Sequence, residues 1–171
     1  MKALARVSAV AAIGFSGAIF GFFFAWICST MWGLDAAPPE VAIQAMQAMN
    51  ASVRNATFAP IFFATPLVIA MAATFSWQSS APKAAMYFTL ASMLYLCGGL
   101  VLTMVFNVPM NDALANQVVP DDPQKAQDIW QAYSPRWQRF NILRTIASGM
   151  TLLLCVLGLM ALVQTTETGR A

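Results

Sequence analysis

Amide and carboxyl side chains cluster at the end of an apolar stretch, in the phrase Asn107-Val-Pro-Met-Asn111-Asp112. Asn107 lies at least one helical turn inside the apolar boundary, where a carboxamide without hydrogen-bond partners costs about 1–3 kcal/mol of folding free energy. Pro109 has no backbone N–H and therefore frees a carbonyl upstream. The phrase predicts a broken, hydrated helix end. It is either a helix terminus capped by asparagine or the polar floor of a ligand pocket.

A second polar cluster leads into the last apolar stretch and consists of Trp137, Arg139, Asn141 and Arg144. Asn141 and Arg144 are three residues apart, so they share one face of a helix. Arginine presents a fixed fork of donors that suits an anion or an oxyanion. The same residue types also suit interfacial anchoring, with tryptophan at the membrane surface and arginine side chains extending towards water. The residues leave both interpretations open.

The chain lacks the residues that several classes of catalytic and cofactor-binding site require. The chain has no histidine, which excludes histidine-ligated haem, copper and iron sites and any Ser-His or Cys-His catalytic unit. It contains no phosphate-binding loop, dinucleotide-binding glycine pattern, CxxC or HExxH motif. No carboxylate pair lies within an apolar stretch, so a proton-driven transporter would lack its usual acid. We therefore expect no metal site, no bound cofactor and, since no basic run exists, no nucleic-acid partner.

The composition indicates which elements must position these residues. Hydrophobic residues make up 59% of the 171 residues and charged residues 9%, whereas a soluble domain has about 25% charged residues. The apolar excess must face something, and lipid is the simplest candidate. Four apolar stretches exceed the ~20 residues that cross a hydrocarbon core. We predict one transmembrane domain over residues 1–171, with spans at about 7–32, 57–77, 84–108 and 143–165.

The connections between these spans differ in length. The two on one side are long, and each predicts a helix that begins with proline, over about 39–54 and about 122–136. The predicted fold is thus all-α, an integral membrane four-helix bundle with two longer helical loops on one side. Four crossings place both termini on the same side. The short basic N-terminus favours the cytoplasmic side, in what we expect to be a bacterial inner membrane.

The chain resembles the anthrone oxygenase family, also called DUF1772, over most of its length. Four features carry the resemblance: WICSTMW at the end of the first span, AIQAMQAMNASVR before the second, NVPMNDAL after the third, and the W-x-R-x-N-x-x-R pattern that begins at Trp137. The resemblance implies a small four-helix membrane protein. For the characterised branch it also implies oxygenation of an anthrone to an anthraquinone by O2, without an evident metal or flavin.

The resemblance leads to a hypothesis for the site. Arg139 and Arg144 would stabilise the substrate anion, and Asp112, or a water that it orients, would be the base. Pro109 would shape the backbone. The residues assigned to substrate binding, by hydrogen bonds or by stacking, are Asn107, Asn111, Trp130, Trp137 and Asn141. Asp112 and Trp130 are assigned from residue chemistry alone, whereas the others match the family pattern.

Three hypotheses for function remain open. The first is a cofactor-independent membrane oxygenase of a polycyclic aromatic substrate. The second is a non-enzymatic subunit or assembly factor of a larger membrane complex, whose apolar faces would contact a protein partner or a second copy. The third is a small transporter or lipid-binding protein. The lipid bilayer is a partner in all three, and an aromatic-lined cavity at the level of Asn107 would favour the first.

Overall fold

The computed structural model describes the backbone of residues 1–168 and the side chains of residues 1–165. This part of the chain is all-helical, as predicted. Its elements are α1 (Lys2–Ala25), η1 (Trp26–Thr30), α2 (Met31–Ala36), α3 (Pro39–Ser52), α4 (Phe58–Gln78), α5 (Pro82–Tyr95), η2 (Leu96–Val101), η3 (Thr103–Asn107), α6 (Val108–Ala115) and α7 (Pro123–Thr168), where η marks a π-helical segment.

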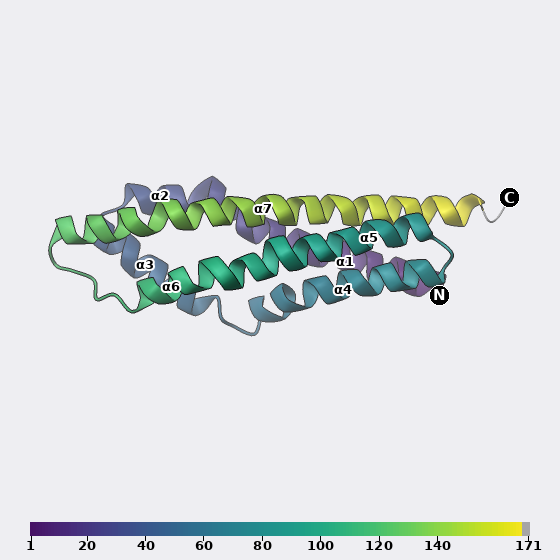
Figure 1. Cartoon of the computed structure of the whole chain (residues 1–171), viewed down its shortest axis with the longest axis horizontal. Coiled ribbons are helices and arrows are strands. Elements are labelled where there is room, and N and C mark those ends of the chain that lie inside the picture. Colours follow the sequence, from purple (N-terminus) through teal and green to yellow (C-terminus); the bar gives the residue numbers. More distant parts are fainter. Residues whose placement is uncertain (169–171) are drawn as a thin grey trace.

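Four long helices form the bundle, and each is long and apolar enough to cross a membrane. Two of them join several elements: Lys2–Ala36 contains α1, η1 and α2, and Pro82–Ala115 contains α5, η2, η3 and α6. The other two are α4 and α7. In the bundle α1 packs on α4 and α7, and α5 packs on the same two helices. The start of α1 and the end of α7 lie at the same end of a narrow rod (Figure 1). The prediction of a four-helix membrane bundle is confirmed.

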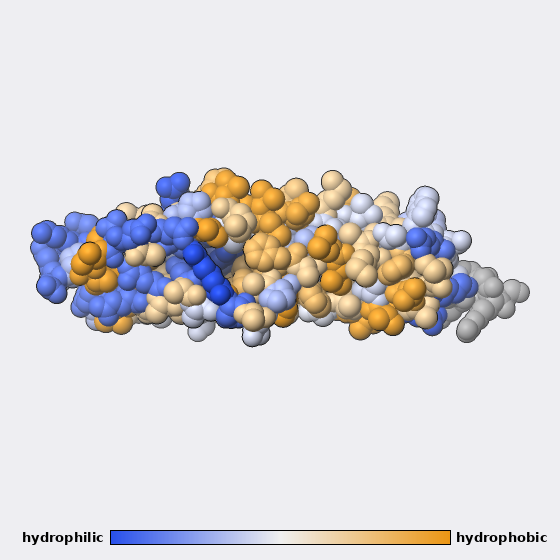
Figure 2. Space-filling view, turned by 90° about the horizontal axis from the view of Figure 1, so that it is seen from below, coloured by the Kyte–Doolittle hydropathy of each residue, from blue (hydrophilic) through white to orange (hydrophobic). Residues whose placement is uncertain are grey.

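The two ends of the rod differ in surface. Figure 2 shows hydrophilic residues gathered at the end that carries α2, α3 and α6, and a mainly hydrophobic surface over the rest of the face. The hydrophilic end has its own core, which contains Trp26, Met31, Ile43, Met46, Leu114, Trp130 and Trp137. These residues come from helices before and after the two long connections. The parts of the helices that extend beyond the apolar bundle therefore pack on one another.

Helix α7 differs from the sequence prediction, which placed a separate loop helix before the last span. The predicted loop helix over residues 122–136 is the first part of α7, which continues without a break from Pro123 to Thr168. At 1.5 Å per residue a helix of 46 residues is about 69 Å long, more than twice the ~30 Å of a hydrocarbon core. Pro135 lies inside α7 but is exposed, so water can satisfy the carbonyl that it leaves free. The same helix therefore serves both the apolar and the hydrophilic part of the protein.

The helix end predicted at Pro109 is not broken. The backbone changes to π-helical turns over η2 and η3, in which Leu102 N–H donates to the Cys97 carbonyl and Val108 N–H to the Thr103 carbonyl. Pro109 then stands in the first turn of α6, where its missing N–H costs little. Such π-turns absorb an irregularity within a continuous helix. The helix therefore continues to Ala115 and carries Asn107 and Asn111 along one side.

The proline inside α4 is compensated by a neighbouring helix. Pro66 cannot donate to the carbonyl of Phe62, four residues before it. The hydroxyl of Tyr95 on α5 donates to that carbonyl at 3.0 Å, and Ser92 donates to the carbonyl of Pro66 at 2.8 Å. Tyr95 is fully buried. Because lipid offers no hydrogen bonds, these contacts from α5 allow proline inside a membrane helix.

We expect the substitution Tyr95→Phe to lower the free energy of unfolding by about 1 kcal/mol, because the Phe62 carbonyl loses its donor. In a Pro66→Ala background the restored backbone N–H serves that carbonyl, so the same substitution should cost clearly less. Thermal unfolding of the four proteins in detergent, followed by circular dichroism, measures both losses. Equal losses in the two backgrounds would contradict this account.

Candidate functional site

A cavity of about 400 Å³ lies between the helices where the apolar bundle meets the hydrophilic end. This volume falls within the ~300–1,000 Å³ of small-molecule sites. Seven of its 16 lining residues are aromatic: Phe22, Phe23, Trp26, Phe58, Phe62, Phe63 and Trp137. The polar side chains in the wall are Asn50, Arg54, Thr103, Asn111 and Arg144. Wide apolar walls with a few converging polar groups are typical of a site for a flat aromatic ligand.

Arg144 is the central polar group of this cavity, and only 5% of it is exposed. Its guanidinium lies over two rings, 4.4 Å from the centroid of Phe23 and 4.9 Å from that of Trp137. Within the described part of the chain it forms no ion pair. A buried cation normally has a carboxylate beside it, because the loss of hydration is otherwise uncompensated. The rings supply part of that compensation through cation–π attraction.

Two polar side chains hold the guanidinium in place. Arg144 Nε donates to Asn141 Oδ1 at 2.9 Å, and Arg144 Nη1 donates to Thr103 Oγ1 at 3.5 Å. Asn141 also donates to the carbonyl of Phe23 at 3.3 Å, which connects α7 with α1. Arginine has five N–H donors. The remaining donors are available to a ligand in the cavity.

The helical period explains why these residues meet. Trp137, Asn141 and Arg144 follow one another at four and three residues, so they form one stripe along α7. Thr103, Asn107 and Asn111 follow at four-residue steps along the helix that contains η3 and α6. The two stripes face each other, since Asn107 Nδ2 donates to the Trp137 carbonyl at 3.5 Å.

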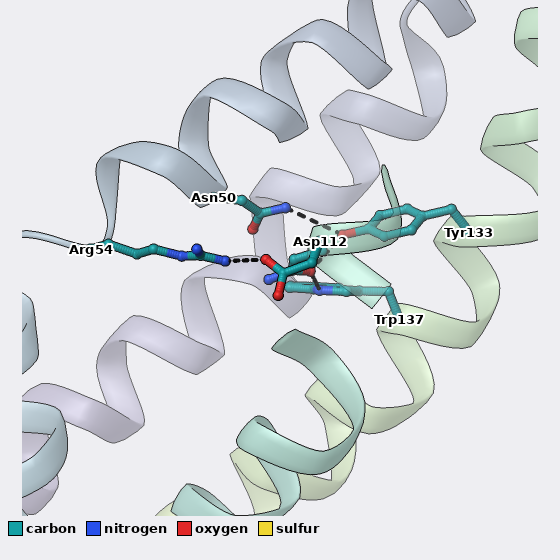
Figure 3. A network of polar contacts seen from close by, with 6 residues as sticks. Asn50, Arg54, Asp112, Tyr133 and Trp137 are labelled. Atoms are coloured by element: carbon teal, nitrogen blue, oxygen red, sulfur yellow. Dashed lines mark hydrogen bonds and ion pairs between the residues drawn. The ribbon is translucent and has the colours of Figure 1, made fainter. Parts of the chain in front are cut away.

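A hydrogen-bonded network forms the hydrophilic side of the cavity (Figure 3). Asn111 Oδ1 accepts from the Tyr133 hydroxyl at 2.9 Å and from Trp137 Nε1 at 2.8 Å. Asn50 of α3 donates to the Tyr133 oxygen at 3.5 Å. Three helices are thereby connected around one carboxamide, which fixes the plane of the Trp137 ring against the cavity.

An ion pair between Arg54 and Asp112 lies beside this network (Figure 3). Both side chains are more than half exposed, so the pair contributes little to stability on its own. Arg54 lines the cavity, whereas Asp112 does not. The pair joins the end of α3 to α6 and marks the water-facing edge of the cavity.

The structure places the predicted site residues in three groups. Asn111, Trp137 and Arg144 line the cavity, and Asn141 holds Arg144. Asn107 is fully buried next to them but is not in the wall, and its Oδ1 accepts no hydrogen bond from the described residues. The third group also lies outside the cavity wall and consists of Pro109, Asp112, Trp130 and Arg139.

Arg139 and Trp130 have clear reasons to lie elsewhere. Arg139 is two residues, or about 200° around the helix, from Trp137, and its side chain is exposed on the outside of α7. Trp130 Nε1 donates to Asp35 Oδ1 at 2.9 Å. Asp35 also accepts from Ser134 at 2.7 Å and from Gln138 at 2.8 Å. Trp130 therefore anchors α2 to α7 within the hydrophilic core.

The sequence prediction missed Thr103 and every aromatic residue of the wall except Trp137. Phe22, Phe23 and Trp26 stand in an apolar run where any aromatic residue also suits lipid contact, so the sequence offers no distinguishing signal. Thr103 is one turn before Asn107, and that four-residue spacing was an available signal. No group of three or more potential metal-ligating His, Cys, Asp or Glu side chains is found among the described residues.

We expect Asn111→Ala to lower the free energy of unfolding by about 2 kcal/mol, because the buried donors of Tyr133 and Trp137 lose their acceptor. Asn111→Asp is the matched control, since its carboxylate keeps the acceptor oxygen that serves both donors. Thermal unfolding in detergent, followed by tryptophan fluorescence, compares the two variants. If the alanine variant were as stable as the aspartate variant, the network would not have the role described.

A family model described as anthrone oxygenase matches residues 46–154. The match includes every polar residue of the cavity wall and leaves out only the part contributed by α1 and η1. No match was found among curated proteins or among solved structures. The family match agrees with the sequence resemblance and extends over more than half of the 171 residues. This chain belongs to the anthrone oxygenase family.

Proposed function

We propose that the protein is a membrane oxygenase that binds a flat aromatic ketone of the anthrone type in this cavity and converts it to a quinone with O2. The observation that carries the proposal is Arg144, a buried cation that packs against two rings in an aromatic-lined cavity and forms no ion pair with any described residue. Such a site fits a planar ligand that brings its own negative charge. The cavity also favours a ligand-binding function over that of a membrane subunit.

The reaction balances without a further reactant. An anthrone carries a methylene group opposite its ketone, and loss of one methylene proton gives an electron-rich anion. This anion reduces O2 and forms a carbon–peroxide bond. Loss of the second methylene proton and cleavage of the O–O bond then give the second ketone. One oxygen atom is retained in the quinone, and the other leaves as water with the two protons.

The residues of the cavity have distinct roles in this proposal. Arg144 stabilises the anion by placing a fixed positive charge where negative charge develops. Trp137 and Phe23 hold the rings of the substrate near that charge, and exclusion of water protects the peroxide. Asn111 is placed to donate to a keto oxygen or a peroxide. Asp112, at the water-facing edge, accepts the first proton through water. None of these roles uses a metal or an organic cofactor.

We further propose a location for the site. The chain would lie in a bacterial inner membrane with α1 beginning and α7 ending on the cytoplasmic side, because the short N-terminus is basic. The cavity and the hydrophilic end would then face the periplasm. Protease protection of inverted and right-side-out vesicles tests this orientation.

We expect Arg144→Met to lower kcat/KM for O2 uptake with an anthrone by about 10²–10³, since the anion loses its fixed positive charge. The apolar replacement should still fold, because removing an unpaired buried charge does not leave another charge unpaired. Arg139→Met is the matched control and should keep the activity of the natural chain, since Arg139 lies outside the cavity. An oxygen electrode with protein in detergent measures both. Equal activity of the two variants would contradict the proposal.

We expect Asn141→Asp to raise KM by about tenfold, because a carboxylate next to Arg144 Nε would neutralise the charge reserved for the substrate. The shape of the side chain stays the same, so the guanidinium keeps its acceptor. In an Arg144→Met background the same substitution should change KM little, and the double-mutant comparison isolates the effect on the charge. A similar rise in both backgrounds would assign Asn141 to direct substrate binding instead.

A further inference from the structure

A second cavity opens on the outside of the bundle between α1 and α4, with a volume of about 440 Å³. We call it the α1–α4 groove. Its lining consists of Ala18, Ile19, Phe22, Trp26, Met49, Ser52, Val53, Asn55, Thr57, Phe58 and Ile61. Four of these residues, Phe22, Trp26, Val53 and Phe58, also line the cavity that contains Arg144. The groove and the inner cavity therefore lie on opposite sides of one wall.

Three of the four shared residues are aromatic. The centroids of Phe22 and Phe58 lie 4.6 Å apart with an angle of 43° between the rings, and Trp26 is 6.4 Å from Phe22. Phe58 is the first residue of α4, which begins where the Asn55 carboxamide accepts from the backbone N–H of Thr57 and of Phe58. Phe22 and Phe58 line both cavities, so a rotation of these two rings changes the separation between the cavities.

The groove has an apolar floor and a polar rim. Ile19, Phe22 and Ile61 belong to the membrane-crossing helices, whereas Ser52 is the last residue of α3 and Asn55 belongs to the connection between α3 and α4. A flat aromatic ketone with the same division of apolar body and polar edge concentrates at the membrane interface. The edge of the inner cavity near Arg54 instead carries the exposed ion pair with Asp112, which suits water and protons.

We propose that the α1–α4 groove is a second binding site, which takes the aromatic substrate from the bilayer and passes it through the Phe22–Phe58 wall to the cavity of Arg144. The proposal rests on the ligand class of the proposed function, a flat apolar ketone. Its route depends on the geometry of the two cavities and does not require that the ligand reacts with O2.

The test compares Ala18→Phe with Ala132→Phe in lipid nanodiscs. Ala18 lines the groove and not the inner cavity, and its side chain is exposed. Ala132 lines a separate groove of about 290 Å³ between α6 and α7, so the same substitution there is the matched control. Stopped-flow quenching of tryptophan fluorescence by anthraquinone reports binding, because Trp26 and Trp137 line the inner cavity. O2 uptake with an anthrone reports the reaction.

We expect Ala18→Phe to slow association and dissociation of anthraquinone together by about tenfold, with little change in Kd, because a blocked route changes rates and not the bound state. Ala132→Phe should leave both rates unchanged. Phe58→Ala should speed association, since it opens the wall. The proposal is overturned if Ala18→Phe and Ala132→Phe bind alike, even where both oxidise the anthrone. If the association and dissociation rates change as expected while the natural chain consumes no O2, the results support the binding route and contradict the oxygenase function.

Discussion

A cation buried inside a membrane bundle requires compensation from its surroundings, and Arg144 receives it from three helices. The rings of Phe23 of α1 and Trp137 of α7 pack against it, Asn141 accepts from its Nε, and Thr103 of η3 accepts from Nη1. Because Arg144 belongs to α7, the contacts with Phe23 and Thr103 limit how the other two helices rotate and slide against α7. The position of one guanidinium thus restricts the packing of the bundle around the cavity.

The second constraint is the backbone. Within lipid every N–H and C=O group needs a partner in the protein, yet this chain places Pro66 in one membrane helix and Pro109 at the end of another. Tyr95 donates to the Phe62 carbonyl that Pro66 leaves free, and the π-helical turns of η2 and η3 precede Pro109. Both solutions keep the helices continuous. Continuity matters because the same helices carry the apolar bundle and the hydrophilic end that borders the site.

The continuous helices also explain how a small protein forms a cavity with both aromatic and polar residues in its wall. The rings come from α1, η1, α4 and α7, while Asn50, Arg54 and Asn111 come from the parts near water. In the proposed function, a flat ketone at this junction would have its rings against phenylalanine and tryptophan and its oxygen near Arg144. The aromatic residues shared with the α1–α4 groove would then lie on the proposed route from the bilayer.

The sequence by itself determined the class of protein and one face of the site. The four apolar stretches, the absence of histidine and the spacing of Trp137, Asn141 and Arg144 are local properties, because helical periodicity and the length of a span depend on neighbouring residues only. The same local rules did not predict that α7 would continue through residues 122–136, since an exposed proline is compatible with either a break or a helix.

Only the tertiary structure decided which polar residues share the cavity. The sequence pattern does not distinguish Arg139 from Arg144. Because they are five residues apart on α7, the Arg139 side chain lies on the outside and the Arg144 side chain lies in the cavity. Trp130 is directed to Asp35, and the rings of Phe22 and Phe58 become a wall, only because α1, α4 and α7 pack in one particular arrangement. A cavity wall is assembled from residues far apart in the chain, and no local pattern encodes their distance.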